Sequence, residues 1–426
     1  MPRRKNLVLK EKSRLWGAGG KLAQSSLIVM AWQAVRLLML AIWVIFAARA
    51  LGAQGYGVFS GTAGLATTLA GFAGLGIGFL MYQRVVISPA EFSHRWRQTM
   101  AVTVASGFLF ACMFVPLSLL VFGTVSAQVI ALIATSEVFL FPLVGASAFA
   151  FSAHERMGWA AALPAISAAL RLLAVMLFSY AATTHDLSHY LWYHLAASAI
   201  GSLVSFVSVH RILRPVRAPL SVDKSDFAEG LAFSAVWFTG GAMASLDKSL
   251  VLRIGGSAMA GLYASAYRFA SVLAMPIDAM VMTAMPRLFR AGAGHSSYPR
   301  LVAYMSTATL LYGVVVGGVL WLGAGELPWL LGEQFADAVP ALKWMCLFIP
   351  IYGMRQLGSQ LLVAEGKKMS RAAVDICALG VMALLAHFLI PAWGLIGAVA
   401  MLLVTEALLV LVIWGTALRF GRRLPA

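Results

Sequence analysis

Charged residues are scarce in this sequence. Only 11% of the 426 residues are charged, whereas 61% are hydrophobic, and the mean hydropathy is +0.85. Soluble domains carry about 25% charged residues, so the chain has too few polar side chains to cover a soluble globule of this size. The composition therefore excludes a soluble protein and indicates one that crosses a membrane several times.

Cysteine is also rare, and motifs for several kinds of chemistry are missing. Cys112, Cys346 and Cys377 all fall in apolar stretches, so neither a disulfide framework nor a metal-ligand spacing is present and no cofactor is expected. The sequence has no GxxxxGK[ST] motif, so the chain is not expected to hydrolyse ATP. Its longest polar internal loop, 210–230, holds no paired catalytic groups, which disfavours a membrane glycosyltransferase or polymerase.

Long apolar stretches dominate what is present. A membrane-spanning helix needs about 20 mostly apolar residues, and these stretches are too long, and alternate too little, to be strands of a barrel. We predict an all-α polytopic membrane protein, with a basic N-terminal segment at 1–25 and a basic tail at 418–426. The twelve expected spans are 26–48, 58–81, 99–122, 128–151, 158–181, 190–209, 231–252, 260–282, 301–323, 340–363, 371–391 and 394–417.

The basic residues predict the orientation. If both ends of the chain lie inside, the inner segments hold 24 of the 32 Lys and Arg residues, and the outer loops hold Arg49 and Arg253. Cytoplasmic loops are enriched in Lys and Arg, so we expect both ends of the chain to lie on the cytoplasmic side of the membrane. The net charge of +16 then reflects this bias and attraction to anionic lipids, not a nucleic-acid partner.

The sequence repeats itself at an offset of 204 residues. Shifting RALGAQGYGVFSGTAG, which begins at Arg49, onto RIGGSAMAGLYASAYR aligns Arg49 with Arg253, Gly52 with Gly256 and Gly57 with Gly261. The offset predicts two six-helix lobes, 26–209 and 231–417, joined by the cytoplasmic loop 210–230. Six is an even number, so the repeat is parallel, and transporters built in this way bind substrate between the repeats. The four aligned glycines predict compact outer turns and close helix packing.

Seven motifs follow one another along the chain. They are Arg49–Phe59, GFAGLGIGFLMYQR at 71–84, DKSLVL at 247–252, GLYASAYR at 261–268, AMPRL at 284–288, LLGEQFADAVPALKW at 330–344 and LLVAEGKKMSRAA at 361–373. Their order and spacing resemble those of the bacterial polysaccharide flippases, a family of the multidrug/oligosaccharidyl-lipid/polysaccharide exporter superfamily, which implies a location in the bacterial cytoplasmic membrane. The resemblance covers essentially the whole chain. It implies two lobes around a central cavity that opens alternately to each side, and transfer of undecaprenyl-diphosphate-linked oligosaccharide repeat units to the outer leaflet for exopolysaccharide, capsule or O-antigen synthesis.

Charged residues within the expected spans are candidate ligands and coupling groups. A charge at the bilayer centre costs at least ~2.5–3.5 kcal/mol, so such residues face protein or a wet cavity, and arginine can hold a phosphate through two hydrogen bonds. Arg36 and Lys248 lie in corresponding helices and are the leading diphosphate ligands. Structural pairing is an equally weighted alternative for every candidate cation: Arg36, Arg171, Lys248, Arg268 and Arg355.

Coupling to a proton or sodium gradient would require a buried carboxylate. Asp247, Asp375 and Glu406 are candidates, although each could instead neutralise a nearby cation. Asp247 and Lys248 point about 100° apart on a helix and need not pair. Lys343 and Arg371 lie near the ends of expected spans and are predicted to be interfacial.

Two other transport functions stay open at this stage. A drug or metabolite antiporter of the same superfamily would favour acids and aromatics in its cavity, whereas five intramembrane cations suit an anionic substrate. A lipid II flippase is not distinguished by charge, but the absence of an extra two-helix extension favours the sugar-repeat branch. The sequence leaves open whether a polysaccharide polymerase or export machinery is a partner.

Overall fold

The computed structural model describes residues 2–181, 186–220, 224–291, 298–364 and 367–421, and within these ranges it contains helices and turns but no strand. The predicted all-α fold is confirmed. The side chains of 2–25 and 417–421 lie outside the description, so the roles of the two basic termini stay predictions. The α-helices are α1 (Pro2–Ala70), α2 (Ile77–Ile87), α3 (Phe92–Phe122), α4 (Ala127–Ile133), α5 (Phe141–Ala153), α6 (Met157–Ala181), α7 (Leu187–Ile212), α8 (Lys224–Ala291), α9 (Tyr298–Gly323), α10 (Leu327–Leu331), α11 (Ala338–Met345), α12 (Phe348–Ala364) and α13 (Lys368–Gly421).

Three of these helices contain a sharp break at a glycine. The break in α1 is at Gly52 (φ 69°, ψ 176°), that in α8 is at Gly256 (φ 81°, ψ 176°), and that in α13 is at Gly394 (φ 57°, ψ −131°). A positive φ strains residues that carry a side chain, and glycine adopts it freely. Gly52 and Gly256 are separated by the repeat offset and share one backbone conformation, so the predicted repeat is confirmed in the geometry of its turns.

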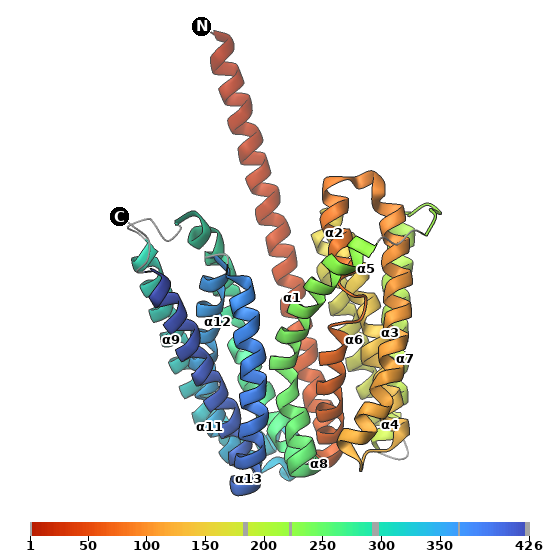
Figure 1. Ribbon diagram of the computed structural model, residues 1–426, viewed down its shortest axis with the longest axis vertical. Helices are drawn as coiled ribbons and strands as arrows, with labels where there is room; N and C mark the ends of the chain where they lie inside the picture. Colours follow the sequence, from red (N-terminus) through yellow and green to blue (C-terminus); the bar gives the residue numbers. More distant parts are fainter. Residues whose placement is uncertain (1, 182–185, 221–223, 292–297, 365–366, 422–426) are drawn as a thin grey trace.

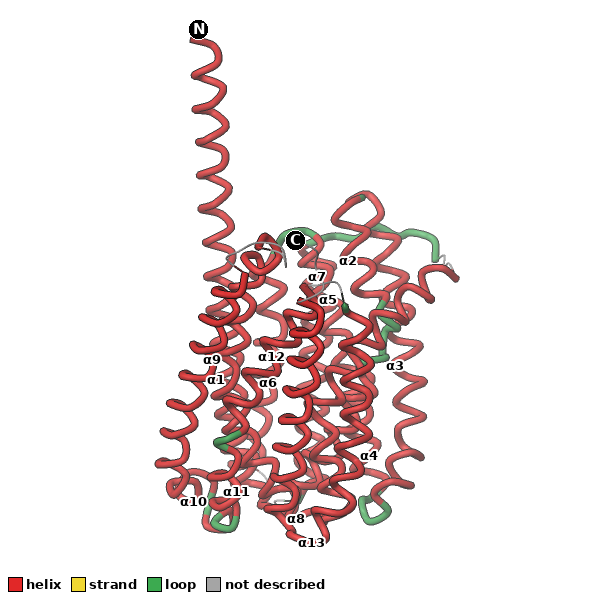
Figure 2. The backbone as a smooth tube through the Cα atoms, turned by 60° about the vertical axis from the view of Figure 1, so that its left-hand side comes forward, coloured by secondary structure: helices red, strands yellow, loops and turns green. Residues whose placement is uncertain are grey.

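The two halves of the chain form two groups of helices. Helices α2 to α7 lie together on one side, α9 and α11 to α13 lie on the other, and α1 and α8 run between them (Figures 1 and 2). The groups approach each other at the end that carries Gly52 and Gly256, which we call the turn end, and splay apart toward the opposite end (Figure 1). Helix α13 ends on the same side of the bundle as α1 begins.

The surface of the bundle is rich in exposed large apolar side chains, such as Leu120, Leu322 and Phe388. Exposure of this extent marks a surface that meets another apolar phase. Seven helical stretches in the described part of the chain are long and apolar enough to cross a membrane, and Ser26–Ala70 and Met369–Thr416 are each about twice the length of one crossing. The chain is a multi-pass membrane protein, and the count of twelve spans stays a prediction.

One expected span is interrupted. The apolar stretch 58–81 predicts one continuous span, but in the structure α1 ends at Ala70, six residues form turns, and α2 begins at Ile77. Gly74, Leu75 and Gly76 all have positive φ in this break. A Cβ atom on Gly76 would lie 2.0 Å from the main-chain oxygen of Gly230. The break therefore lets the chain of the first half pass against the start of α8 at backbone distance.

A candidate anion-binding cavity between the two halves

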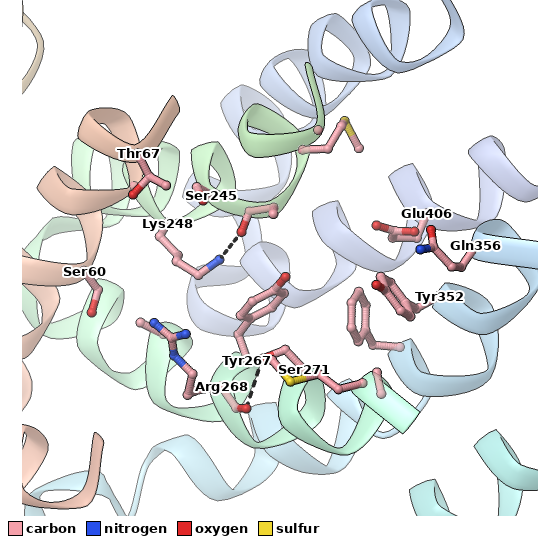
Figure 3. A pocket seen from close by; sticks show the side chains of 18 of the residues that line it. Ser60, Thr67, Ser245, Lys248, Tyr267, Arg268, Ser271, Tyr352, Gln356 and Glu406 are labelled. Atoms are coloured by element: carbon pink, nitrogen blue, oxygen red, sulfur yellow. Dashed lines mark hydrogen bonds between the residues drawn. The ribbon is translucent and has the colours of Figure 1, made fainter. Parts of the chain in front are cut away.

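A polar cavity of about 460 Å³ lies between the halves of the repeat. The second half of α1 supplies one wall, α8 supplies the centre, and α12 and α13 supply the opposite wall (Figure 3). This position agrees with the predicted site at the repeat interface. The charged residues that line it are Lys248, Arg268, Asp278, Arg355, Arg371, Asp375 and Glu406.

Lys248 is held by neighbouring groups in α8. Its Nζ atom lies 2.8 Å and 3.1 Å from the two carboxylate oxygens of Asp247 and 2.9 Å from the main-chain oxygen of Ala244. Tyr263 donates a hydrogen bond of 2.7 Å to the same carboxylate, and the Lys248 ammonium lies 3.5 Å from the ring centroid of Tyr267. The two sequence neighbours therefore do pair, because the long lysine side chain reaches back across the angle between their positions.

Two further cations of the cavity have acidic partners. Arg355 Nε donates a hydrogen bond to Glu406, and Arg371 lies 3.8 Å from Asp375 on the same face of α13. The remaining acid, Asp278, accepts hydrogen bonds of 3.0 Å from the hydroxyl group of Tyr352. Much of the charge in the cavity is therefore arranged as neutral pairs.

Arg268 differs from the other cations of the cavity. Its side chain makes no ion pair or hydrogen bond with any residue in the described part of the chain. The guanidinium points into the space beside Ser60 and Lys248 (Figure 3). Because three of the four lining cations are already paired, the positive charge available to a ligand is concentrated at Arg268.

The structure places the other predicted cations elsewhere. Neither Arg36 nor Arg171 lines the cavity. Arg171 in α6 lies 3.0 Å from the Glu137 carboxylate, which also lies 2.8 Å from His194 Nε2. Glu137 and His194 are buried, and Glu137 belongs to a π-helical segment, Ala134–Leu140, between α4 and α5. Arg171 thus takes part in a polar cluster inside the first half of the chain.

Arg371 lines the cavity although the sequence predicts an interfacial position for it, near the start of an apolar stretch. Asp278, an acid within an expected span, also lines the cavity. One signal could have identified Arg371: Asp375, a candidate in its own right, follows four residues later, and side chains at this spacing share a helix face.

Glycines of α1 form a close seam with α8 beside the cavity. Cβ atoms on Gly61 and Gly64 would lie 2.5 Å from the side chain of Leu252 and 2.4 Å from the main-chain oxygen of Ser245, respectively. Ser249 closes the seam with a hydrogen bond of 2.7 Å to the main-chain oxygen of Gly61. Side chains larger than hydrogen at these positions would hold the halves apart.

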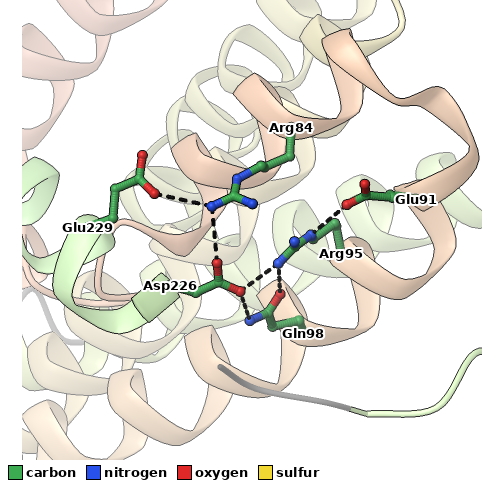
Figure 4. A network of polar contacts seen from close by, with 6 residues as sticks. All are labelled: Arg84, Glu91, Arg95, Gln98, Asp226 and Glu229. Carbon is green, nitrogen blue, oxygen red and sulfur yellow. Dashed lines mark hydrogen bonds and ion pairs between the residues drawn. The ribbon is translucent and has the colours of Figure 1, made fainter. Parts of the chain in front are cut away.

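A second polar network joins the halves at the end opposite the turns (Figure 4). Buried Asp226 near the start of α8 bonds Arg95, lies 3.5 Å from Arg84, and accepts a hydrogen bond of 3.0 Å from Gln98. Burial alone would raise the pKa of Asp226. The hydrogen bonds from Gln98 and Arg95 and the positive charges of Arg95 and Arg84 outweigh burial, so this pKa lies below its usual value.

Comparison with known proteins identifies the family. The family model described as "Polysaccharide biosynthesis protein" matches residues 22–291. The chain belongs to this family. No curated protein sequence matches the chain.

Solved structures share the fold of this polysaccharide biosynthesis family member. An inward-facing multidrug resistance MATE transporter of the MOP superfamily has a TM-score of 0.71 at 14% identity, with 92% of this chain and 94% of that chain covered. The lipid II flippase MurJ in an inward closed conformation has a TM-score of 0.70 at 13% identity, with 92% and 87% covered. An outward-facing MATE transporter has a TM-score of 0.59 at 14% identity, with 93% and 94% covered. The chain therefore has the fold of a membrane transporter.

Proposed function

We propose that this protein is a flippase that moves undecaprenyl-diphosphate-linked oligosaccharide repeat units from the inner to the outer leaflet by alternating access. The family, the transporter fold and the polar cavity between the repeat halves support this function. In the proposed orientation both ends of the chain are cytoplasmic and the turn end faces outward. The higher similarity to the inward-facing transporter supports an inward-facing state for the arrangement described here.

One observation supports the proposal most directly. The Arg268 side chain lines the cavity and has no ion-pair or hydrogen-bond partner among the described residues. A guanidinium can bind phosphate oxygens through two parallel hydrogen bonds, and here it lies in a cavity shared by both halves. The hydroxyl groups of Ser60, Thr67 and Ser271 line the same space and could bond a sugar or a phosphate. We therefore assign the diphosphate to Arg268, with Lys248 and Arg355 as neighbouring positive charges, in place of Arg36 and Arg171.

The candidate coupling carboxylates lie around this cavity. Asp375 and Glu406 line it, and Asp247 lies directly behind Lys248. One oxygen of Asp375 is buried and has no hydrogen-bond partner among the residues that the structure describes. Asp375 therefore has an unused site for a proton or a sodium ion, which supports a coupling role for this residue above the other two.

The test is translocation of a fluorescent undecaprenyl-diphosphate oligosaccharide in proteoliposomes. Wild type is compared with Arg268→Ala and with Arg217→Ala, a matched control on an exposed arginine in the inter-lobe loop. Loss of a charge-assisted hydrogen bond costs about 1.5–3 kcal/mol, so we expect Arg268→Ala to slow translocation by about tenfold or more. The Arg217→Ala variant should transport at the wild-type rate.

Two results would change the assignment. If wild type does not translocate the lipid but exports cationic dyes, the protein is a drug antiporter of the same superfamily. If wild type translocates it and Arg268→Ala does so equally well at matched abundance, the function stands and the diphosphate site is elsewhere.

A further inference from the structure

The two arginines related by the repeat differ in their contacts. Arg49 donates hydrogen bonds of 2.8 Å and 2.7 Å to the main-chain oxygens of Leu330 and Trp329 at the end of α10. Arg253 occupies the equivalent position one turn before the break in α8. It is exposed and makes no hydrogen bond or ion pair with the part of the chain that the structure describes. The repeat thus contains one structural arginine and one whose hydrogen-bond donors are unused.

Arg253 lies at a crevice of about 210 Å³ that is separate from the central cavity. Both halves of the chain form it: Leu65 of α1 and Val121 of α3 on one side, and Leu250 of α8 and Met382 of α13 on the other. Apart from Arg253 and Ser249, its lining is apolar. Since Ser249 already bonds Gly61, Arg253 is the unused polar group, and it lies close to the turn end.

This combination fits an anionic lipid. A single cation next to apolar walls complements a molecule with a phosphate group at one end and a hydrocarbon chain at the other. A crevice of about 210 Å³ has room for a phosphate group and a short piece of chain. A soluble anion would leave the apolar walls uncovered, and a neutral lipid would leave Arg253 without a partner.

The crevice and the central cavity both adjoin the glycine seam between α1 and α8. Ser249 contributes to the crevice, whereas Ser245 and Lys248, on the same helix, line the cavity. A rocking motion that opens the turn end would separate α1 from α8 along this seam. The crevice would then adjoin the cavity on the side where the lipid chain meets the membrane.

We propose that the crevice at Arg253 is the site where the diphosphate of the polyprenyl-linked substrate binds as it leaves the cavity for the outer leaflet. The inference rests on the proposed function and adds a lateral exit. The polyprenyl-linked substrate is favoured over a bulk phospholipid, because the walls come from both halves and adjoin the seam that must open for release.

Photocross-linking in proteoliposomes tests this site. The full chain carries p-benzoylphenylalanine at Ala383, which lines the crevice, or at Leu384, its neighbour, which is 59% exposed and does not line it. The probe is undecaprenyl diphosphate with one labelled sugar, in phosphatidylcholine vesicles. We expect labelling at 383 to exceed that at 384. We also expect Arg253→Gln to reduce labelling at 383 by about tenfold, and Arg253→Lys to retain most of it.

The competitors are neutral undecaprenol and phosphatidylglycerol. The site is supported if excess of either leaves the labelling at 383 unchanged. Displacement by phosphatidylglycerol would overturn the proposal in favour of a general anionic-lipid site, and displacement by undecaprenol would show that the diphosphate is not recognised. Equal labelling at 383 and 384 would also overturn it.

Translocation measured in the same vesicles separates this inference from the proposed function. If wild type translocates the probe without preferential labelling at 383, the exit site is wrong and the flippase function stands. If wild type is labelled at 383 but does not translocate the probe, the lipid site stands and the flippase function is wrong.

Discussion

Gly57 and Gly261 lie against each other's helices at the turn end, in two contacts that the repeat exchanges. A Cβ atom on Gly57 would lie 1.9 Å from the main-chain oxygen of Ser257, and one on Gly261 would lie 1.9 Å from that of Ala53. Ala53 and Ser257, like the two glycines, are 204 residues apart. The two copies of the repeated motif therefore pack against each other. Each glycine contacts the main chain of the other copy, which holds α1 and α8 together at backbone distance.

Gly57→Val and Gly261→Val should each impair transport severely. The obstructing atoms belong to the main chain, which cannot move aside as a flexible side chain can, and overpacking of this kind costs about 1–3 kcal/mol or more. We expect translocation in proteoliposomes to fall at least about tenfold. The matched control is Gly145→Ala, because a Cβ atom there would meet nothing within 4 Å. Normal transport by both valine variants at normal abundance would show that the contact has no mechanical role.

The Asp226 network should make the stability of the protein depend on pH. The pKa of Asp226 is lowered in the folded protein, so its contribution is complete above the unfolded-state value of about 3.9. That contribution is lost as the pH falls through the lower folded-state pKa. We expect Asp226→Asn to lower the free energy of unfolding at pH 7 by about 1–3 kcal/mol, and to unfold with a weaker dependence on pH below about pH 4.

Thermal unfolding of the detergent-solubilised protein measures both effects. Exposed Glu155, which has no ion pair in the described residues, supplies the control variant Glu155→Gln. A pH profile of Asp226→Asn that matches the wild-type profile would show that another group controls acid unfolding.

The sequence predicts some levels of this structure better than others. Hydropathy and charge bias identify the membrane class, and the 204-residue offset predicts the matching breaks at Gly52 and Gly256. Hydropathy does not report which face of an apolar helix meets the cavity, so Arg371 was placed at the interface. The break at Gly74–Gly76 was missed because its residues are as apolar as those of a continuous helix.

Arg36 and Lys248 lie in corresponding helices of the two halves, but they do not occupy corresponding positions along those helices. The offset of 204 places Val44, not Arg36, on Lys248, and Val44 is buried. Arg36 lies eight residues earlier, which is about 12 Å along a helix. The two cations therefore occupy different depths, and the structure brings only Lys248 to the cavity.

Variants of Arg171 and Glu137 distinguish two roles for Arg171: a structural ion pair with Glu137, or binding of the substrate. Removing one partner of a buried ion pair costs about 3–5 kcal/mol because the other charge is left uncompensated. We expect Arg171→Gln alone to lower the unfolding temperature strongly, and Arg171→Gln with Glu137→Gln to recover most of the loss. Thermal unfolding of the two single variants and the double variant gives the coupling energy. Additive effects, with translocation lost at unchanged stability, would return Arg171 to the list of substrate ligands.

Substitution by glutamine should destabilise the protein at Arg49 but not at Arg253. Arg49→Gln removes two hydrogen bonds that attach α1 to the end of α10, and bonds from a charged donor contribute about 1.5–3 kcal/mol each when well shielded. Arg49 is exposed, so we expect a loss in the free energy of unfolding of only about 1–2 kcal/mol in total. Arg253→Gln removes no contact within the described chain and should change stability by less than ~0.5 kcal/mol, while it slows release of the lipid.

Each variant serves as the other's control, since both lose one exposed arginine at equivalent positions of the repeat. Equal destabilisation by the two substitutions would mean that Arg253 has a structural partner after all, and the difference between the repeated turns would then carry no functional meaning.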